Sequence, residues 1–407
     1  MSDATSDKRI RVLLFLPSMH GGGAERMAMH LLNHLDRAEF AVKIGLMRRS
    51  GAYLSELDPQ HLDWARWGEK FLDYDKGNAA SYRPRRLLAG AGLIPANFVA
   101  ILRRQRPHVV ISFLKGSSVC TRIAVALYGR SKVRWIAREG NNPYAVLEDE
   151  LQQPMARAFI ERLVGHTYRS ADAVVAISHG LAGTLQSGLK VPGSRLRTIP
   201  NAVDITKVQA LALAEPAWLP NRPFVIGVGR LERQKGFDVL IRAYAASATR
   251  TTHDLVIIGE GNERTALENL IQNLNLQGQV HLPGFMDNPW AHMARSSAFV
   301  LSSLWEGFGN VVIEAMACGT PVIVTDCDYG PSEVAANGSF GLVIPRNSEL
   351  ALTAALDTLS LDGDLRSQLI DKGLQRAKDY DVTHVVQQYA ALIRSLIPAL
   401  LDAPSSR

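Results

Sequence analysis

Short apolar runs alternate with amphipathic stretches along almost the whole chain. In the first half, runs typical of buried strands occupy residues 11–17, 40–47, 109–114, 134–138 and 173–177, and residues 24–35 repeat apolar positions at helical spacing. The alternation starts again with strand-like runs at residues 224–228, 255–258, 279–282, 298–301, 321–325 and 341–344. Residues 350–401 have a helical pattern. This alternation predicts parallel sheets with helices on both faces.

The restart of the pattern predicts two domains. Residues 1–204 contain the first set of strands, residues 205–378 contain the second, and residues 379–407 form a helical segment. Three prolines mark residues 214–223 as a linker. We therefore expect two doubly wound, Rossmann-like α/β domains that face each other across a cleft. Ligands of such sheets lie outside the carboxyl ends of the strands.

Composition excludes several classes of protein. The chain has 407 residues, of which 47% are hydrophobic and 21% charged, as in a soluble globular protein. No apolar run is long enough to cross a bilayer, and the run at residues 12–16 is too short for a signal-peptide core. The three scattered cysteines favour a reducing, cytoplasmic environment over a disulfide framework or a zinc site.

Basic residues gather in the first half. Residues 1–205 hold 29 Lys and Arg against 18 Asp and Glu, whereas residues 206–407 hold 16 against 21. No acidic residue occurs between Asp75 and Glu139, a stretch with 13 Lys and Arg. Such a face predicts an anionic partner. Because no RNA-binding signature or aromatic interleaving is present, we expect no nucleic acid, but an anionic membrane surface or a phosphate on a substrate.

Residues 83–106 are the most basic part of this stretch. Arginines flank the mildly apolar run at residues 87–101, at positions Arg83, Arg85, Arg86, Arg103, Arg104 and Arg106. An amphipathic helix with this pattern can lie on a membrane, with its arginines at lipid phosphates. An ordinary surface helix packed on the sheet has the same pattern. The sequence leaves both interpretations open.

The segment from Leu304 to Ile323 carries the strongest chemical signal. It places two carboxylates, Glu306 and Glu314, on either side of a turn that contains Gly307 and Gly309. These glycines allow tight backbone turns and the close approach of a ligand. The helix predicted after them has a positive N-terminal end that suits a phosphate, and Glu314 lies further along it, where it suits a sugar diol.

This Glu-x7-Glu spacing resembles the signature of the retaining, nucleotide-sugar-dependent glycosyltransferases of family 4, which have the GT-B fold. Further segments agree with that family in the same order: Gly21 to Arg26, Gly227 to Asp238, Ile258 to Gly261, and Leu282 to Phe285. The resemblance implies that residues 1–204 bind the acceptor, that residues 205–378 bind the nucleotide sugar, and that the C-terminal helix returns to the first domain.

The resemblance also implies roles for charged residues. Arg230 and Lys235 would stabilise the negative charge that grows on the leaving diphosphate. Arg233 and Gln234 compete for this role by position, and the resemblance selects Arg230 and Lys235. Glu306 would bind sugar-ring hydroxyls and hold the developing positive charge of the ring. Glu314 would accept hydrogen bonds from the two ribose hydroxyls.

Other residues are implied to bind the donor: Gly22, Gly23, Phe308, Gly309, Asn310 and Val311. A metal would need an Asp-x-Asp pair, and the sequence has one at Asp326 and Asp328 and another at Asp362 and Asp364. Since Arg230 and Lys235 already neutralise a diphosphate, we expect no metal and no cofactor beyond the nucleotide-sugar substrate.

Three segments narrow the identity of the acceptor. They lie at residues 109–114, 137–143 and 325–333, and they resemble bacterial members that extend polyprenyl-diphosphate-linked sugars. Relatives that use lipopolysaccharide or exopolysaccharide acceptors share parts of them. Arg138, Asn141 and Asn142 are implied to bind the acceptor. That branch usually has Ser-Glu-Arg-Asn where this chain has Arg-Glu-Gly-Asn at residues 138–141. No histidine of this chain is assigned a catalytic role.

The sequence therefore predicts a cytoplasmic, membrane-peripheral, retaining glycosyltransferase. It would move a hexose or N-acetylhexosamine from a UDP-sugar to a lipid-linked saccharide, a nascent polysaccharide or lipopolysaccharide. A GDP-mannose-dependent mannosyltransferase and a nucleotide-sugar 2-epimerase of the same fold are the alternatives. A glycosidase would leave the glycines and Arg230 with Lys235 unexplained. This chain lacks the Gly-x-Gly-x-x-Gly spacing of a dinucleotide-dependent oxidoreductase. A lectin-like scaffold would not need Glu306 and Lys235.

Overall fold

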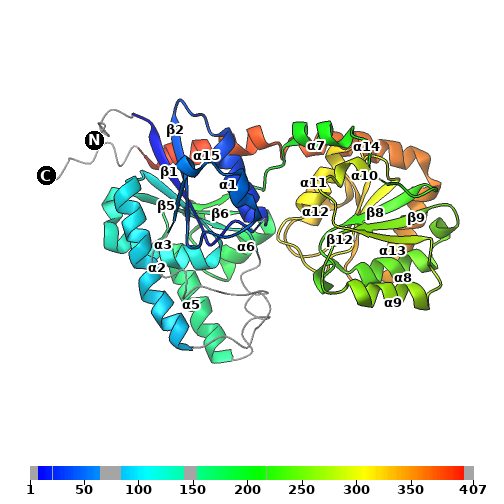
Figure 1. Cartoon of the computed structure of the whole chain (residues 1–407), viewed down its shortest axis with the longest axis horizontal. Helices are drawn as coiled ribbons and strands as arrows, with labels where there is room; N and C mark the ends of the chain where they lie inside the picture. Colours follow the sequence, from blue (N-terminus) through cyan, green and yellow to red (C-terminus); the bar gives the residue numbers. More distant parts are fainter. Residues whose placement is uncertain (1–7, 21, 65–83, 142–153, 217, 398–407) are drawn as a thin grey trace. The chain divides into compact units, whose positions relative to one another are not determined.

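The computed structural model describes residues 8–20, 22–64, 84–141, 154–216 and 218–397 (Figure 1). The chain divides into two compact units, each with its own parallel sheet. Unit 1 comprises Met1–Pro200 and Val385–Arg407, and unit 2 comprises Asn201–His384. The chain enters unit 2 four residues before the expected boundary at residue 204 and leaves it at His384, after the expected boundary at residue 378.

Unit 1 is built on a seven-stranded parallel sheet with the order β3-β2-β1-β4-β5-β6-β7. Apolar runs form the central strands because a sheet covered on both faces buries every side chain of those strands. The strands are β1 (Ile10–Leu16), β2 (Phe40–Leu46), β3 (Leu62–Trp64), β4 (Val109–Phe113), β5 (Arg134–Glu139), β6 (Ala173–Ala176) and β7 (Leu196–Thr198). The two three-residue edge strands, β3 and β7, are absent from the predicted set.

The helices of unit 1 cover the two faces of this sheet. They are α1 (Gly23–His34), α2 (Pro84–Gln105), α3 (Leu114–Tyr128), α5 (Pro154–Ser170), α6 (His179–Ser187) and most of α15 (Val382–Leu396). Helices α2, α3 and α5 pack side by side (Figure 1). None of the helices in the described ranges is long and apolar enough to cross a bilayer.

The C-terminal half of α2 packs into unit 1. Phe98, Ile101 and Leu102 are at most 1% exposed, and the ring of Phe98 stacks on that of Phe15 with centroids 3.6 Å apart. Arg104 donates to Asp63 over 2.7 Å, so it is already engaged. Two interpretations of residues 83–106 were open. For residues 98–104 the structure shows the helix packed on its unit. Arg83 lies outside the described residues.

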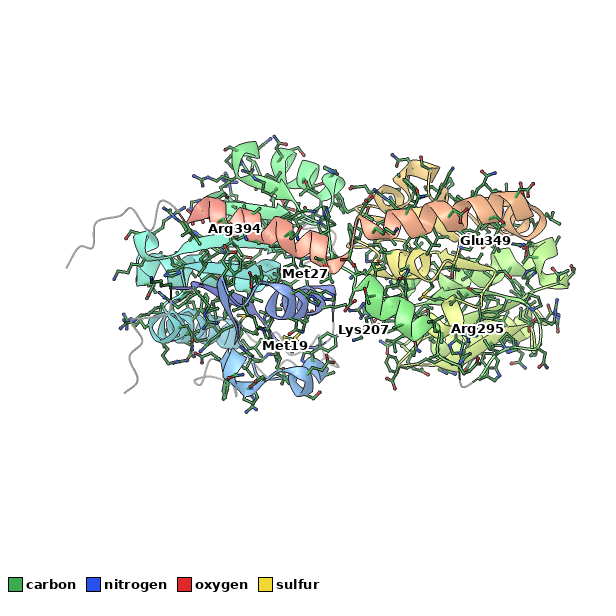
Figure 2. All side chains as sticks on the ribbon, turned by 90° about the horizontal axis from the view of Figure 1, so that it is seen from above. Met19, Met27, Lys207, Arg295, Glu349 and Arg394 are labelled. Carbon is green, nitrogen blue, oxygen red and sulfur yellow. The ribbon has the colours of Figure 1, made fainter. Side chains whose placement is uncertain are left out.

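Helix α15 joins the end of the chain to unit 1, as the predicted return of the last helix requires. Arg394 makes two hydrogen bonds to the carboxylate of Glu39, of 2.7 and 2.6 Å, and lies on this helix beside the strands and helices of unit 1 (Figure 2). Further in, Tyr389 is fully buried and accepts a hydrogen bond from Arg138. The predicted C-terminal helix of the fold is confirmed.

Unit 2 is built on a six-stranded parallel sheet with the order β10-β9-β8-β11-β12-β13. Its strands are β8 (Phe224–Val228), β9 (Asp254–Ile258), β10 (Val280–Gly284), β11 (Ala298–Leu301), β12 (Val322–Asp326) and β13 (Leu342–Pro345). All six coincide with predicted strands to within a few residues. The two doubly wound sheets confirm the predicted fold class.

Eight helices in the described part of unit 2 surround this sheet or join its strands: α7 (Ile205–Ala212), α8 (Phe237–Ala246), α9 (Arg264–Asn273), α10 (Trp290–Met293), α11 (Asn310–Ala317), α12 (Pro331–Val334), α13 (Glu349–Leu361) and α14 (Gly363–Lys378). The predicted helical tail is thus three helices, α13, α14 and α15. It breaks at Asp362, whose side chain caps α14 by accepting a hydrogen bond from Leu365 N.

The proline-rich segment at residues 214–223 is not the linker between the units, which corrects the prediction. It lies within unit 2, between α7 and β8. Its Trp218 carbonyl bonds to His292 Nε2 over 2.9 Å, so this part of the segment is held against unit 2. Prolines mark a stretch without helix or strand here, and that stretch packs on its own unit.

Candidate functional site

Two loops meet at the carboxyl edge of the unit 2 sheet, because β8 and β11 are neighbours in it. Leu304 N donates to Gln234 O over 2.8 Å, and the Gln234 side chain donates to Trp305 O over 2.8 Å. Gly236 has φ 58°, and a Cβ there would lie 2.4 Å from Ser302 O. Only glycine permits this approach, so the sequence locks the loop after β8 onto the loop after β11.

Lys235 and Glu306 form an ion pair where these loops meet. Lys235 Nζ lies 2.6 Å from Glu306 Oε1, and their side chains are only 15% and 9% exposed. The hydroxyl of Ser303 donates to the same oxygen over 2.7 Å. Thr325 holds Ser303 in turn, by donating to its carbonyl over 2.6 Å. The two residues predicted at the diphosphate and at the sugar are therefore in direct contact.

Arg230 follows β8 on the same edge and places its charge at the surface. Its side chain is 66% exposed and pairs with Glu232 over 2.7 Å. An exposed pair of this kind contributes little stability, so the guanidinium can exchange Glu232 for a stronger anion at low cost. Arg233, the competing arginine, lines a different hollow of unit 2. The structure thus distinguishes Lys235, which contacts Glu306, from Arg233, which lines the hollow.

Glu314 lies on α11, which begins after the loop that carries Glu306. The side chain is buried, and its Oε2 accepts a hydrogen bond of 2.9 Å from the indole nitrogen of Trp290. A buried carboxylate requires such a donor, because an unsatisfied one is costly. Sequence reasoning missed Trp290, which lies in no motif and comes 24 residues before its partner.

The predicted donor-binding residues 308–311 surround the start of α11. Gly309 precedes the helix with φ 82°, and Asn310 Oδ1 accepts from Asn201 Nδ2 over 2.8 Å. Val311 is half-buried in the first turn. The ring of Phe308 is only 4% exposed and packs edge-on against Tyr380. The ring of Phe308 therefore belongs to the core, and the donor-binding role of this residue stays a prediction.

In unit 1, the predicted glycines lie at the N-terminal end of α1, directly after β1. Gly22 is the residue before the helix and Gly23 its first residue, and both are exposed. A Cβ on Gly22 would approach Glu25 Oε2 to 2.7 Å. The N-terminal end of this 12-residue helix has free backbone N–H groups, and the donor-binding role of Gly22 and Gly23 stays a prediction. Gly21 lies outside the described residues.

Arg138 is placed differently from the prediction. Its side chain is 1% exposed, Nε donates to Tyr389 Oη over 3.0 Å, and the guanidinium lies over the ring of Phe113. A side chain buried in this way does not reach a ligand, so the acceptor-binding role of Arg138 is corrected to a structural one. It ties β5 to α15.

The neighbouring loop is organised by a buried carboxylate. Glu139 is fully buried and accepts hydrogen bonds from Gly140 N over 2.9 Å, Asn141 N over 3.0 Å and the hydroxyl of Tyr168. Burial, and then the negative Glu139, raise the pKa of Tyr168 well above its usual value. Asn141 itself is exposed and stays a candidate for binding the acceptor, whereas Asn142 lies outside the described residues.

In the described ranges, no group of three or more His, Cys, Asp or Glu side chains could hold a metal ion. Of the Asp-x-Asp candidates, Asp328 lies 3.9 Å from Arg346, and Asp362 caps α14. The three cysteines are free, and burial raises the pKa of each thiol to about 12. Thiols of this kind are inert, so no cysteine is assigned a role.

Two family descriptions match the chain, one on each half. Residues 21–207 match "Glycosyltransferase Family 4", and residues 212–376 match "Glycosyl transferases group 1". The first match covers the loop after β1, and the second covers Lys235, Glu306 and Glu314. The paired glutamate and lysine therefore lie in the half that matches the group 1 transferases.

Named relatives agree with these matches. A Campylobacter jejuni N-acetylgalactosaminyltransferase, whose name gives N-acetylgalactosamine-N,N'-diacetylbacillosaminyl-diphospho-undecaprenol as its substrate, is 29% identical over 92% of this chain and 96% of its own. The lipopolysaccharide core glycosyltransferase LpsE of Rhizobium meliloti is 28% identical over 86% of this chain and 89% of its own.

Solved structures agree on the fold. HepE from Anabaena, crystallised with UDP, superposes with a TM-score of 0.75 at 19% identity, covering 95% of this chain and 100% of its own. Sucrose-phosphate synthase from Thermosynechococcus elongatus gives 0.75 at 21% identity, covering 96% and 100%. The family matches, the relatives and the two doubly wound sheets lead to one assignment: this chain belongs to the family 4 glycosyltransferases of the GT-B fold.

Proposed function

We propose that the protein is a metal-independent, anomer-retaining glycosyltransferase that moves an N-acetylhexosamine or hexose from a UDP-sugar to a lipid-diphosphate-linked saccharide or polysaccharide. The observation that carries this proposal is the half-buried pair of Lys235 and Glu306, with Arg230 at the same edge of the sheet. A cation and a carboxylate held together there suit a reaction in which a diphosphate leaves and a sugar becomes positive.

Lys235 is assigned to the leaving group. Its ammonium has three N–H donors, and one of them is used on Glu306. The remaining donors can reach phosphate oxygens, and Arg230 adds a second cation by releasing Glu232. A fixed cation such as Lys235 stabilises charge as it develops, without rearranging during the reaction. Together the two cations supply the charge that a divalent ion would otherwise bring.

Glu306 is assigned to the donor sugar. Ser303 and Lys235 both donate to Oε1, and Oε2 accepts no hydrogen bond from the described residues. Oε2 can therefore accept from a sugar hydroxyl, while the carboxylate stabilises positive charge on the ring. Hydrogen bonds to Oε1 reduce the nucleophilicity of the carboxylate, so we assign Glu306 to binding rather than to covalent attack.

In this reaction the bond from the anomeric carbon to the donor phosphate breaks, and a bond to the acceptor oxygen forms on the same face. The acceptor hydroxyl gives its proton to the departing diphosphate. Glu314 accepts the ribose hydroxyls in this assignment, with Trp290 holding its other side. The amino sugar is suggested by the N-acetylgalactosaminyl transfer named for the Campylobacter jejuni relative, and the UDP donor by the UDP with which HepE was crystallised.

Peripheral binding to the inner face of the cell membrane is the last part of the proposal. Two apolar side chains of α3, one helical turn apart, reach solvent: Ile123 is 38% exposed and Leu127 65% exposed. Met155 on the neighbouring α5 is 88% exposed. Exposed basic residues accompany these helices, at positions Arg103, Arg106 and Arg130. Apolar side chains beside basic ones suit an anionic lipid surface.

A donor panel tests the transfer. Nucleotide release would be measured with UDP-N-acetylgalactosamine, UDP-N-acetylglucosamine, UDP-glucose, UDP-galactose and GDP-mannose, each with a bacterial lipid extract as acceptor and with EDTA present. We expect release from a UDP-sugar and an unchanged anomeric configuration in the product by NMR. The Glu306→Gln variant should be inactive, and the Glu349→Gln variant, altered at an exposed position on α13, should match the wild type.

Different outcomes contradict different parts of the proposal. Release from GDP-mannose alone would show that the donor is GDP-mannose and not a UDP-sugar. A product with inverted anomeric configuration would contradict the retaining mechanism. Loss of activity in EDTA that Mg²⁺ restores would remove metal independence. Conversion of the free UDP-sugar to its epimer, without an acceptor, would replace transfer by epimerisation.

A further inference from the structure

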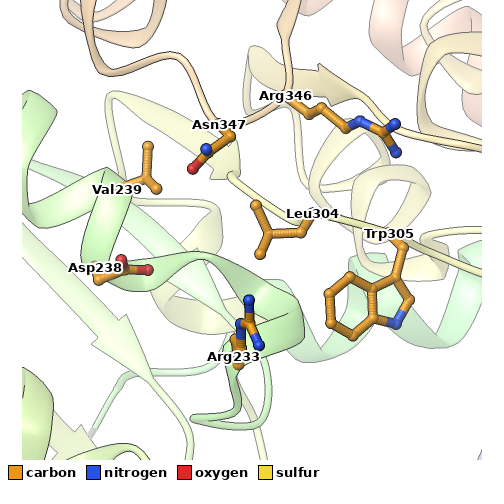
Figure 3. Close-up of a pocket in the computed structure, with 7 residues that line it drawn as sticks. All are labelled: Arg233, Asp238, Val239, Leu304, Trp305, Arg346 and Asn347. Atoms are coloured by element: carbon orange, nitrogen blue, oxygen red, sulfur yellow. The ribbon is translucent and has the colours of Figure 1, made fainter. Parts of the chain in front are cut away.

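Unit 2 has a hollow of about 480 Å³ beside the loops that carry Lys235 and Glu306. It lies between the loop after β8, the first turn of α8, the loop after β11 and the residues that follow β13. Figure 3 shows the side chains around it: Arg233, Asp238, Val239, Leu304, Trp305, Arg346 and Asn347. Its size is that of a small-ligand pocket.

This hollow is separate from the proposed donor site. Arg230, Lys235, Glu306 and Glu314 do not line it. The two places nevertheless share a scaffold, since Arg233 precedes Lys235 by two residues and Trp305 precedes Glu306 by one. The hydrogen bonds that join Gln234 to Leu304 and Trp305 fix the geometry of both.

Polar groups around the hollow have no partner in the part of the chain that the structure describes. This holds for the side chains of Arg233, Asp238 and Asn347 and for the indole N–H of Trp305. Arg346 reaches Asp328 only at 3.9 Å, and both side chains are 54% exposed. Two guanidinium groups and an indole outnumber the single carboxylate, so the hollow offers more donors than acceptors and a net positive charge.

The apolar lining adds a second requirement. Val239 and Leu304 contribute aliphatic surface, and Trp305 contributes an aromatic ring that is part of the lining (Figure 3). The C–H face of a pyranose ring stacks on an indole, and its hydroxyls suit the amide and carboxylate of Asn347 and Asp238. A bare phosphate would leave the ring of Trp305 unused, and a neutral sugar would leave both arginines without an anion.

We propose that this hollow binds an anionic saccharide, meaning a sugar unit that carries a carboxylate or a phosphate. Arg233 and Arg346 hold the acidic group by charge-assisted hydrogen bonds. Trp305 supports the ring, and Asp238 with Asn347 bind its hydroxyls. The site goes beyond the proposed function and does not depend on the donor assignment, because none of the residues that define it serves the donor.

Binding is tested without any transfer reaction. The indole ¹⁵N–H signal of Trp305, assigned with the Trp305→Phe variant, would be followed by NMR on the full chain. Glucuronic acid and glucose 6-phosphate are the complete probes, because each has a sugar ring and an acidic group. Glucose lacks the acidic group, and inorganic phosphate lacks the ring. We expect the complete probes to shift the signal with at least tenfold tighter dissociation constants than the incomplete ones, because each charge-assisted contact is worth about a factor of ten.

Variants connect the signal to the proposed contacts. Arg233→Gln and Arg346→Gln should each weaken the complete probes about tenfold and leave glucose unaffected. Arg242→Gln is the matched control, since Arg242 lies on α8 with a 46% exposed side chain that pairs with Glu349. Saturating UDP should not displace the probes. Equal binding of phosphate and glucuronic acid, or displacement by UDP, would overturn the proposal.

Two further arms identify the source of the anionic sugar. If it belongs to the acceptor, the Arg233→Gln and Arg346→Gln double variant should raise the KM for an oligosaccharide acceptor with an acidic sugar and not for a neutral one. If it is a free metabolite, glucose 6-phosphate should change the rate with a neutral acceptor in the wild type and not in the double variant. If the protein shows no transfer at all, the proposed function fails, and the NMR result still decides the site.

Discussion

The indole nitrogen of Trp290 and the carboxylate of Glu314 lie 2.9 Å apart, on two short helices of the same unit. Glu314 is buried, so this donor fixes which direction the carboxylate faces. A residue outside every recognisable motif thus orients the carboxylate that the family pattern assigns to the ribose. The pairing makes the contribution of Trp290 measurable.

Replacing Trp290 with Phe should raise the KM for the donor about tenfold, because the loss of one hydrogen bond to a carboxylate costs about 1.5–3 kcal/mol. The kcat should change less, since the ribose is bound in the ground state as well as in the transition state. Steady-state kinetics with varied donor would show the split. Trp218→Phe is the control, and equal effects of the two variants would show a merely structural role for Trp290.

Replacing Lys235 with Ala should lower kcat by about 10²–10³-fold, the range for loss of one group that stabilises a developing anion. Binding of UDP, measured by calorimetry, should weaken less, because the charge of the leaving group is largest in the transition state. Lys207→Ala, altered at an exposed lysine on α7, is the control. Turnover within a few-fold of the wild type would remove Lys235 from the diphosphate.

The Asp63–Arg104 pair should make unit 1 sensitive to acid. Burial favours a raised pKa for Asp63, but hydrogen bonds from Arg104 and Gln105 outweigh it, and the pKa is lowered. A lowered folded-state pKa contributes stability that is present above the unfolded pKa of about 4 and is lost as the pH falls below it. The wild type should therefore lose part of its stability between about pH 4 and the folded-state pKa of Asp63.

The Arg104→Gln variant should be less stable than the wild type at pH 7 and should lose less stability on acidification, because burial raises the pKa of Asp63 once its main cation is gone. Melting temperatures between pH 3 and 7 would show the flatter pH dependence. Arg103→Gln, at the neighbouring exposed position, should follow the wild-type curve. Parallel curves for all three proteins would contradict the assignment of the acid response to Asp63.

The Tyr389→Phe variant should lower the free energy of unfolding by about 1–2 kcal/mol, since it removes a hydrogen-bond acceptor from the buried Arg138. Urea denaturation would measure the loss. Tyr380→Phe is the matched control, because that hydroxyl makes no hydrogen bond with the described residues and its ring contact with Phe308 is retained. A larger loss in Tyr380→Phe would contradict the role given to Arg138.

For membrane binding, the structure selects which arginines to change. Arg103 and Arg106 are exposed, whereas Arg104 is held by Asp63. Neutralising the first two should weaken binding to anionic vesicles about 30-fold, at about 1 kcal/mol each. Vesicle sedimentation would measure this, with Arg104→Gln as the control and added salt reducing the wild-type affinity. Unchanged sedimentation would place the membrane contact elsewhere.

Most of the fold followed from the sequence because strands buried on both faces appear as continuous apolar runs. The edge strand β3 was not predicted, because Leu62, Asp63 and Trp64 form a run too short and too polar to stand out. The helical tail breaks twice, at Asp362 and again between α14 and α15 at residues 379–381, and the second break was not predicted.

The site was predicted by residue type but not by contact. Lys235 and Glu306 are 71 positions apart, so no local spacing shows that they touch. The resemblance implied that Arg138 binds the acceptor, whereas its side chain is buried and its partner Tyr389 lies 251 positions away. Contacts of this kind depend on which strands become neighbours, and a motif read along the chain does not contain that information.

The assembly of unit 1 from both ends of the chain has a consequence for synthesis on the ribosome. Tyr389 and Arg394 complete the contacts of unit 1, and they are translated after all of unit 2. Unit 2 can therefore finish folding while unit 1 still lacks its last helix, the reverse of the usual order from the N-terminal domain onward. During that interval Arg138 lacks its hydrogen bond to Tyr389. A nascent chain stalled before residue 385 should therefore expose unit 1 to chaperones and proteases.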